Sequence, residues 1–111
     1  MPLPAFIRAL PALDLPFPED RVSTNALRSD GALAVFFTFH EDLELPPHSH
    51  KAQWGTVIKG WLELTMDGKT HRHLPGESYS IPSGTVHSVK GPAGTIVFDL
   101  FEEPDRYALR D

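Results

Sequence analysis

The chain has 111 residues and a mass of 12.3 kDa, the size of one ordinary domain. Its net charge of −5 and its pI near 5.6 argue against a nucleic-acid partner, because phosphate recognition needs a basic surface. The chain has no cysteine, so a bound metal needs nitrogen and oxygen ligands, and no apolar run approaches the ~20 residues of a membrane-spanning helix.

The first twenty residues are rich in proline and apolar side chains. They predict an extended N-terminal arm over residues 1–20, ahead of a β-barrel domain over residues 21–111. Prolines interrupt the continuous apolar stretch that a signal peptide needs, so we expect a cytoplasmic protein. The arm either covers its own barrel or reaches across to a second subunit, and both alternatives remain open.

Short runs rich in β-branched and aromatic residues follow, separated by Gly and Pro. Predicted strands lie within residues 31–40, 54–60, 61–66, 77–84, 85–91 and 95–103. Residues 41–47 are expected to close the first of these strands and cross over. The pattern gives eight or so short strands and no long helix, which indicates an all-β sandwich or barrel.

The dipeptide Asp67-Gly68 predicts a two-residue hairpin turn. That turn sets a register with the facing pairs Met66–Lys69, Thr65–Thr70, Leu64–His71, Glu63–Arg72 and Leu62–His73. Directly opposed residues share a sheet face, so His71 and His73 are predicted to point toward the core with the leucines. The pair is a candidate for the pocket wall, and the alternative is two histidines at the edge of the core.

Two histidines stand one residue apart in the segment PPHSHKAQWG. Alternate residues of a strand point the same way, so His48 and His50 can converge on one point. A third, His87, follows on a separate predicted strand. Three neutral imidazoles suit a divalent transition metal with open coordination positions. A lone His-x-His is more often two exposed histidines near a turn, so the site depends on all three residues.

The spacing around these histidines resembles the two signature motifs of the cupins. The second motif, G-x5-P-x-G-x2-H-x3-N, is matched by Gly76, Pro82, Gly84 and His87, with Gly91 in place of Asn. The first, G-x5-H-x-H-x3,4-E-x6-G, is matched by His48, His50 and Gly60, with Asp42 at the opening glycine. The chain is therefore similar to the small RmlC-like cupins of the cupin_2 type, in a variant with an HSHxxQWG first motif.

Gln53 stands where the family usually has a ligating glutamate, with two residues between it and His50 instead of three or four. The resemblance implies a metal held by His48, His50, Gln53 and His87. The amide oxygen of Gln53 is neutral and is a weaker ligand than a carboxylate. The exchange leaves the site one charge more positive, which favours ligands with carboxylate or enolate character.

The resemblance also implies the fold, the metals and the assembly. The fold is the cupin double-stranded β-helix, a jelly-roll-like barrel of two sheets with the metal in its mouth. The metals are iron, manganese, nickel, zinc or copper, among which ligand type alone does not choose. Cupins commonly form homodimers, often by sharing N-terminal strands.

Three more residues are candidates around such a site. Trp54 either walls the pocket or belongs to the core or a dimer interface. Tyr79 and Asp99 are the candidate catalytic residues. Asp99 is a carboxylate within the apolar run TIVFDLF, and an isolated buried carboxylate is costly. It is therefore expected on the outer face of its strand, with a role as general base in the cavity as the alternative.

Two functions remain open. The first is a metal-dependent enzyme acting on a small anionic organic molecule, as a dioxygenase, decarboxylase, isomerase or hydrolase. The alternative is a non-catalytic cupin that binds or senses a small ligand. A structural cupin with an empty site fits poorly with three converging histidines. Neither nucleic acid nor a membrane is expected as a partner.

Overall fold

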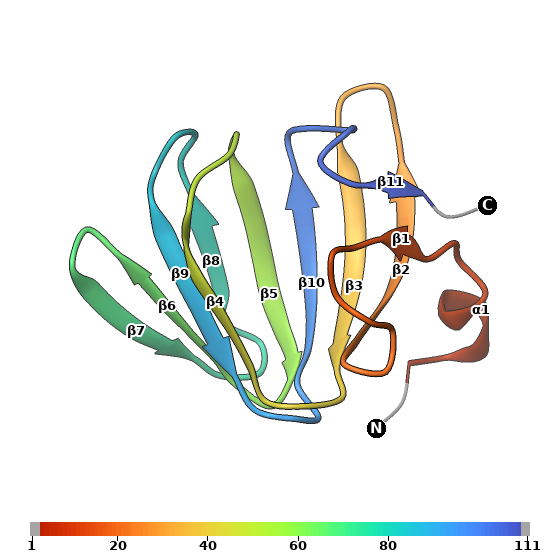
Figure 1. Ribbon diagram of the computed structural model, residues 1–111, viewed down its shortest axis with the longest axis horizontal. Helices are drawn as coiled ribbons and strands as arrows, with labels where there is room; N and C mark the ends of the chain where they lie inside the picture. The colour runs from red at the N-terminus through yellow and green to blue at the C-terminus, as the bar shows by residue number, and fades with distance from the viewer. Residues whose placement is uncertain (1–2, 110–111) are drawn as a thin grey trace.

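The computed structural model of the chain describes residues 3–109, which form antiparallel β-sheets and very little helix. Its elements are α1 (Ala5–Arg8), β1 (Leu13–Asp14), β2 (Val22–Arg28), β3 (Leu33–Phe39), β4 (Leu43–His48), β5 (Gln53–Lys59), β6 (Leu62–Met66), β7 (Lys69–His73), β8 (Ser78–Ile81), β9 (His87–Gly91), β10 (Ile96–Phe101) and β11 (Ala108–Leu109) (Figure 1). Within residues 3–109 there is no helix long and apolar enough to cross a membrane. The all-β prediction is confirmed.

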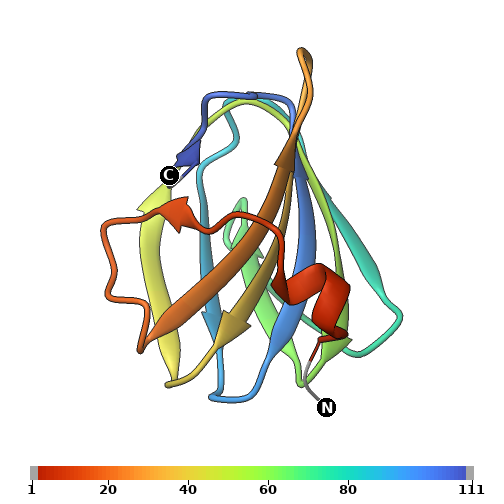
Figure 2. The ribbon, with the colours of Figure 1, turned by 90° about the vertical axis from the view of Figure 1, so that its right-hand side faces the viewer.

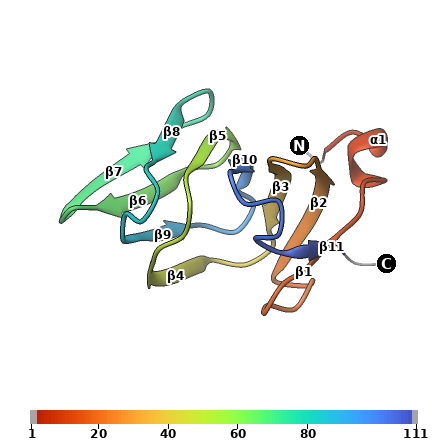
Figure 3. The same cartoon turned by 90° about the horizontal axis from the view of Figure 1, so that it is seen from above.

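Two large sheets make the barrel. One has the strand order β2-β3-β10-β5-β8 and the other the order β4-β9-β6-β7, and all their pairings are antiparallel. The chain passes back and forth between the sheets, so neighbours such as β3 and β10 come from distant parts of the sequence. Seen from above, the two sheets enclose a common interior (Figure 3). This is the predicted jelly-roll topology, in which each face of the core comes from a different sheet.

The N-terminal arm lies across the β2 side of the barrel (Figure 2). The side-chain amide of Asn25 donates hydrogen bonds of 3.1 Å to the carbonyls of Arg8 and Leu10, and Leu13 N–H donates to Thr24 Oγ1 at 2.7 Å. The prediction of an extended arm is wrong at α1, a single helical turn that begins directly after Pro4. These contacts match the alternative in which the arm covers its own barrel, and an exchange between subunits stays a prediction.

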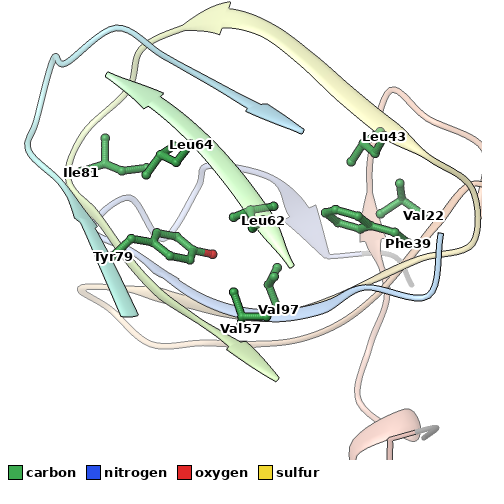
Figure 4. Packing of buried hydrophobic residues seen from close by; sticks show 9 residues of the cluster. All are labelled: Val22, Phe39, Leu43, Val57, Leu62, Leu64, Tyr79, Ile81 and Val97. Atoms are coloured by element: carbon green, nitrogen blue, oxygen red, sulfur yellow. The ribbon is translucent and has the colours of Figure 1, made fainter. Parts of the chain in front are cut away.

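Buried side chains from both sheets fill the interior. Val57 and Val97 of the larger sheet face Leu62 and Leu64 of the smaller one, and the Tyr79 hydroxyl points into the space between them (Figure 4). Burying a side chain of this size contributes roughly 1.5–3 kcal/mol. A second cluster, formed by Leu13, Ala26, Leu33, Val35 and Phe101, continues the core toward β1. The first cluster therefore joins the two sheets, and the second packs β1 against the larger one.

The hairpin of β6 and β7 has the predicted register at all five facing pairs. Asp67 and Gly68 adopt φ values of +53° and +75°, which a two-residue type I′ turn requires. Glu63 and Arg72 form the expected ion pair, at 2.8 Å. The turn chemistry alone was therefore sufficient to place this hairpin.

The sequence analysis missed four strands, namely β1 and β11, of two residues each, and the longer β2 and β4. In β2 the inward residues Val22, Thr24 and Ala26 are small or polar, so the alternation is weak in the sequence although these positions are buried. The expectation that residues 41–47 only cross over is wrong, because β4 covers most of them. Its two prolines cannot donate to the ladder, and they lie where the pairing with β9 is irregular, between Leu45 and His48.

Candidate metal site

The three predicted histidines meet at one end of the smaller sheet. His48 ends β4 and is the cross-strand partner of His87, which begins β9. The irregularity at the two prolines lies directly before His48, and such bulges re-aim the side chains beside them. His50 follows in the loop to β5, where its carbonyl accepts a 2.8 Å hydrogen bond from Gly84 N–H. Both cupin motifs therefore converge on one place.

The imidazoles form a compact triangle. Ring centroids are 4.3 Å apart for His48 and His87, 4.8 Å for His50 and His87, and 5.5 Å for His48 and His50. One ligand nitrogen from each ring lies within 4.8 Å of the other two. Within residues 3–109 this is the one cluster of histidine and carboxylate ligands close enough to hold a metal ion.

Hydrogen bonds to the main chain determine which nitrogen is available. The Nδ1 atoms of His48, His50 and His87 lie 2.8, 2.7 and 2.9 Å from the carbonyl oxygens of Pro46, Lys51 and Thr85. A carbonyl only accepts, so each Nδ1 carries the proton and each Nε2 has a free lone pair. Metal-binding histidines are usually oriented in this way. The donor set thus fits a divalent transition metal.

Burial favours the neutral form that a metal needs. It lowers the pKa of His50 and of His87 below the ordinary value of 6.5, and the positive charge of Arg106 acts in the same direction. Imidazole must be neutral to bind a metal, so protons compete weakly with a cation at neutral pH.

A cavity extends from the histidines into the barrel. Its volume is about 70 Å³ and most of its wall is apolar, with aromatic and aliphatic side chains from both sheets. The polar groups on its wall are His48, His50, Gln53, Tyr79, His87, Asp99 and Tyr107. The cavity therefore joins a polar end that can bind a metal to an apolar interior.

Asp99 lies inside the barrel, and its expected position on the outer face is wrong. Val97, Asp99 and Phe101 alternate along β10 and all point inward. The Tyr79 hydroxyl donates a 2.6 Å hydrogen bond to Asp99 Oδ1, and the Gln53 side chain also hydrogen-bonds to this carboxylate. Burial raises the pKa of Asp99 from 3.8 to about 6, and these two hydrogen bonds act against the rise.

The close approach of β5 to these groups requires Gly55. A Cβ atom at this position would collide with Asp99 Oδ1 and with the ring and hydroxyl of Tyr79. Gly55 is the cross-strand partner of both Asp99 and Tyr79, so all three lie in one row across the larger sheet. The missing side chain makes room for the buried hydrogen bond between the other two.

The predicted pocket residues lie outside this cavity wall. Trp54 is 40% exposed, next to Leu100 on the outer side of the larger sheet. His71 has the predicted partner Leu64, but it does not reach the core, because β7 is an edge strand and His71 is exposed. His73 is half-buried, with its ring 5.3 Å from the Tyr79 ring.

Two residues near the site carried no signal in the sequence. Phe101 packs edge-on against His50, with ring centroids 5.6 Å apart. Arg106 lies over the Tyr107 ring, close enough to His50 and His87 to lower the pKa of both. Its Nε is buried without a hydrogen-bond partner in residues 3–109. The sequence after β10 has the pattern of a polar tail, so nothing in it pointed to the site.

Comparison with known proteins agrees with this geometry. A family model described as "Cupin domain" matches residues 35–99. A mannose-1-phosphate guanylyltransferase of Escherichia coli K12 is 36% identical over 62 residues, which are 56% of this chain and only 13% of that enzyme. This chain thus spans a small part of that curated relative.

Two solved structures show the likeness in fold. An RmlC-like cupin from Shewanella frigidimarina NCIMB 400 is 24% identical with a TM-score of 0.74, over 89% of this chain and 87% of that one. An RmlC-like cupin from Desulfovibrio desulfuricans is 26% identical with a TM-score of 0.63, over 82% and 90%. The family match covers more than half of the chain, and the barrel and both histidine motifs agree with it. The chain therefore belongs to the cupin family, with an RmlC-like fold.

Proposed function

We propose that this cupin is a metal-dependent enzyme acting on a small organic anion. The observation that carries the proposal is the triangle of His48, His50 and His87, with their Nε2 atoms free at the end of a cavity that extends into the barrel. Gln53 is the proposed fourth ligand. A divalent transition metal bound there would act as a Lewis acid or activate oxygen. Iron, manganese, nickel, zinc and copper all accept such ligands.

The small volume and the apolar wall of the cavity restrict the ligands that it can hold. About 70 Å³ is well below the ~150 Å³ of an engineered cavity that binds benzene. The part of a ligand that enters the barrel therefore has few non-hydrogen atoms. The wall beyond the histidines is apolar, so it offers little to a polyhydroxylated molecule such as a sugar. We infer a short carboxylate or enolate with a small alkyl or aromatic group at its other end.

Charge supports the anionic group. The proposed ligands are neutral, so a divalent ion keeps its full charge at the site. Arg106 adds a second positive charge near His50 and His87. Among the groups on the cavity wall, Asp99 and Tyr79 are the candidates for proton transfer.

Metal analysis of the purified protein tests this proposal. We expect about one transition-metal ion per chain in the wild type, strongly reduced in His48→Ala and His87→Ala. His40→Ala is the matched control, because His40 is exposed and its ring bonds to the Ser23 hydroxyl, away from the site. Full metal content in both site variants would refute the assignment. Turnover of short hydroxy and oxo acids, with oxygen uptake recorded, then separates an enzyme from a ligand-binding cupin.

We further propose that the protein is a cytoplasmic homodimer. The outer side of the larger sheet carries Phe36 and Phe98, with ring centroids 4.7 Å apart, beside exposed Trp54 and Leu100. An apolar outer face of this kind suits a second copy better than water. Light scattering should give a dimer for the wild type and a monomer for Trp54→Lys/Leu100→Lys. Val86→Lys, at another exposed apolar residue, should stay dimeric.

A further inference from the structure

The hydrogen bond between Gln53 and Asp99 bears on the fourth ligand. Gln53 and Asp99 both line the cavity that holds the histidines. Phe101, the cross-strand partner of Gln53, packs against the His50 ring, so Gln53 is at the histidine end of the cavity. Asp99 lies farther in, where its Oδ1 already accepts the hydroxyl of Tyr79.

The chemistry of the two groups sets the orientation of the amide. An ionised carboxylate accepts hydrogen bonds and donates none, so Gln53 must present its Nε2–H to Asp99. The Oε1 atom sits on the opposite side of the same planar group. We infer that an amide whose nitrogen is held by Asp99 directs its oxygen away from that carboxylate, toward the end of the cavity where the histidines lie.

Charge gives the contact a second role. A glutamine ligand brings no negative charge to a metal, whereas Asp99 is a carboxylate one hydrogen bond farther away. A carboxylate bonded to the N–H side of an amide polarises it and makes its oxygen a better donor to a cation. Carboxylates behind metal-binding histidines act in the same way.

We propose that Asp99 is a positioning residue that aims Gln53 Oε1 at the metal and supplies the negative charge that glutamine lacks. This inference rests on the proposed metal site at His48, His50 and His87. It is separate from any part Asp99 takes in proton transfer, because it concerns binding of the metal in the absence of substrate.

The test is the affinity of the full chain for Zn²⁺ and Co²⁺, measured by competition with a chelator. Asp99→Asn keeps the shape of the side chain and an oxygen for Tyr79, but removes the charge and frees the Gln53 amide to turn. We expect a loss of roughly 10–100-fold, the range found when groups behind metal ligands are removed. Glu44→Gln, an exposed change of the same charge, should leave the affinity at the wild-type value.

A double variant separates positioning from general damage. In Asp99→Asn/Gln53→Glu the charge moves to the ligand, and the new amide at position 99 can donate to it, so the affinity should recover above that of Asp99→Asn alone. The visible absorption of bound Co²⁺ should change in Gln53→Ala and in Asp99→Asn, since both lose the same ligand oxygen.

The outcomes divide cleanly. Wild-type protein that binds neither ion would overturn the proposed function and this inference together. Normal wild-type binding with an unchanged affinity in Asp99→Asn would overturn the inference and leave the three-histidine site intact. So would a double variant no tighter than Asp99→Asn, or a Co²⁺ spectrum that Gln53→Ala leaves unaltered.

Discussion

Tyr79 and Asp99 share a 2.6 Å hydrogen bond in the interior of the barrel, where each is at most 5% exposed. Burial, and then the charge of Asp99, raise the pKa of Tyr79 well above 10, so the hydroxyl keeps its proton and remains the donor. The two side chains are polar groups on a cavity wall that is mostly apolar. Because the pair is buried only in the folded chain, the pKa of Asp99 affects the free energy of unfolding.

Ionisation of Asp99 should destabilise the metal-free protein as the pH rises from about 4 to about 6. Burial raises the pKa of Asp99 from 3.8 to about 6, so in this interval the folded chain binds more protons than the unfolded chain. The shift corresponds to a loss on the order of 3 kcal/mol, complete above about pH 6. Asp99→Asn lacks this dependence, so it should be the more stable protein above pH 6 and match the wild type near pH 4.

Urea unfolding of both chains at a series of pH values, without metal, measures the difference. Subtracting one curve from the other cancels the histidines, which titrate in both proteins. A difference that is flat between pH 4 and pH 7 would contradict the buried position of an ionisable Asp99.

Gly55→Ala should destabilise the barrel by about 1–3 kcal/mol, the usual cost of overpacking a filled core. The new methyl group would overlap Asp99 and Tyr79, so it should also weaken their hydrogen bond. The free energy of urea unfolding gives the cost. Gly31→Ala is the control, because its Cβ would meet nothing within 4 Å, and an equal loss in the two variants would rule out this explanation.

Arg106→Gln should weaken the binding of short carboxylates to the metal-loaded protein by roughly tenfold, because it removes a positive charge close to His50 and His87. Neutral analogues such as the matching amides should bind as before, because they do not use the positive charge. Calorimetric titration of both ligand series measures this. Arg21→Gln removes an exposed charge paired with Glu41 and should change neither series, so equal effects of the two variants would exclude a specific role for Arg106.

Metal affinity should be nearly constant around neutral pH and should fall only below the ordinary histidine pKa of 6.5. Burial lowers the pKa of His50 and of His87, so these rings take up protons at a lower pH than a free imidazole. Protons therefore begin to compete with the metal only at that lower pH. Chelator competition between pH 5 and pH 8 measures the curve. A steep decline already between pH 8 and pH 7 would be inconsistent with these buried, neutral rings.

The features that the sequence predicted correctly are those that local chemistry determines. The Asp67-Gly68 turn admits one hairpin register, and the structure has it. The glycine and proline spacing of IPSGTVH likewise brings His87 to the site: Gly84, with φ of +80°, turns the chain, and Thr85 N–H closes the turn on Pro82. In such segments a few residues fix the backbone whatever surrounds them.

The features that were missed depend on partners far away in the chain. Whether Asp99 faces in or out is decided by the pairing of β10 with β3 and β5, and its burial is tolerable only because Tyr79 and Gln53 lie opposite. His71 has the predicted partner yet is exposed, because β7 is the last strand of its sheet. No local pattern of residues records either fact.

The three main-chain carbonyls behind the histidines limit how this site can change. Because backbone oxygens hold the Nδ1 protons, substitutions in the side chains nearby leave the tautomer of the imidazoles as it is. The backbone itself thus holds the three rings in the orientation that a metal needs. Substitutions that adjust the metal are then expected at position 53 and at Asp99, which lies behind it.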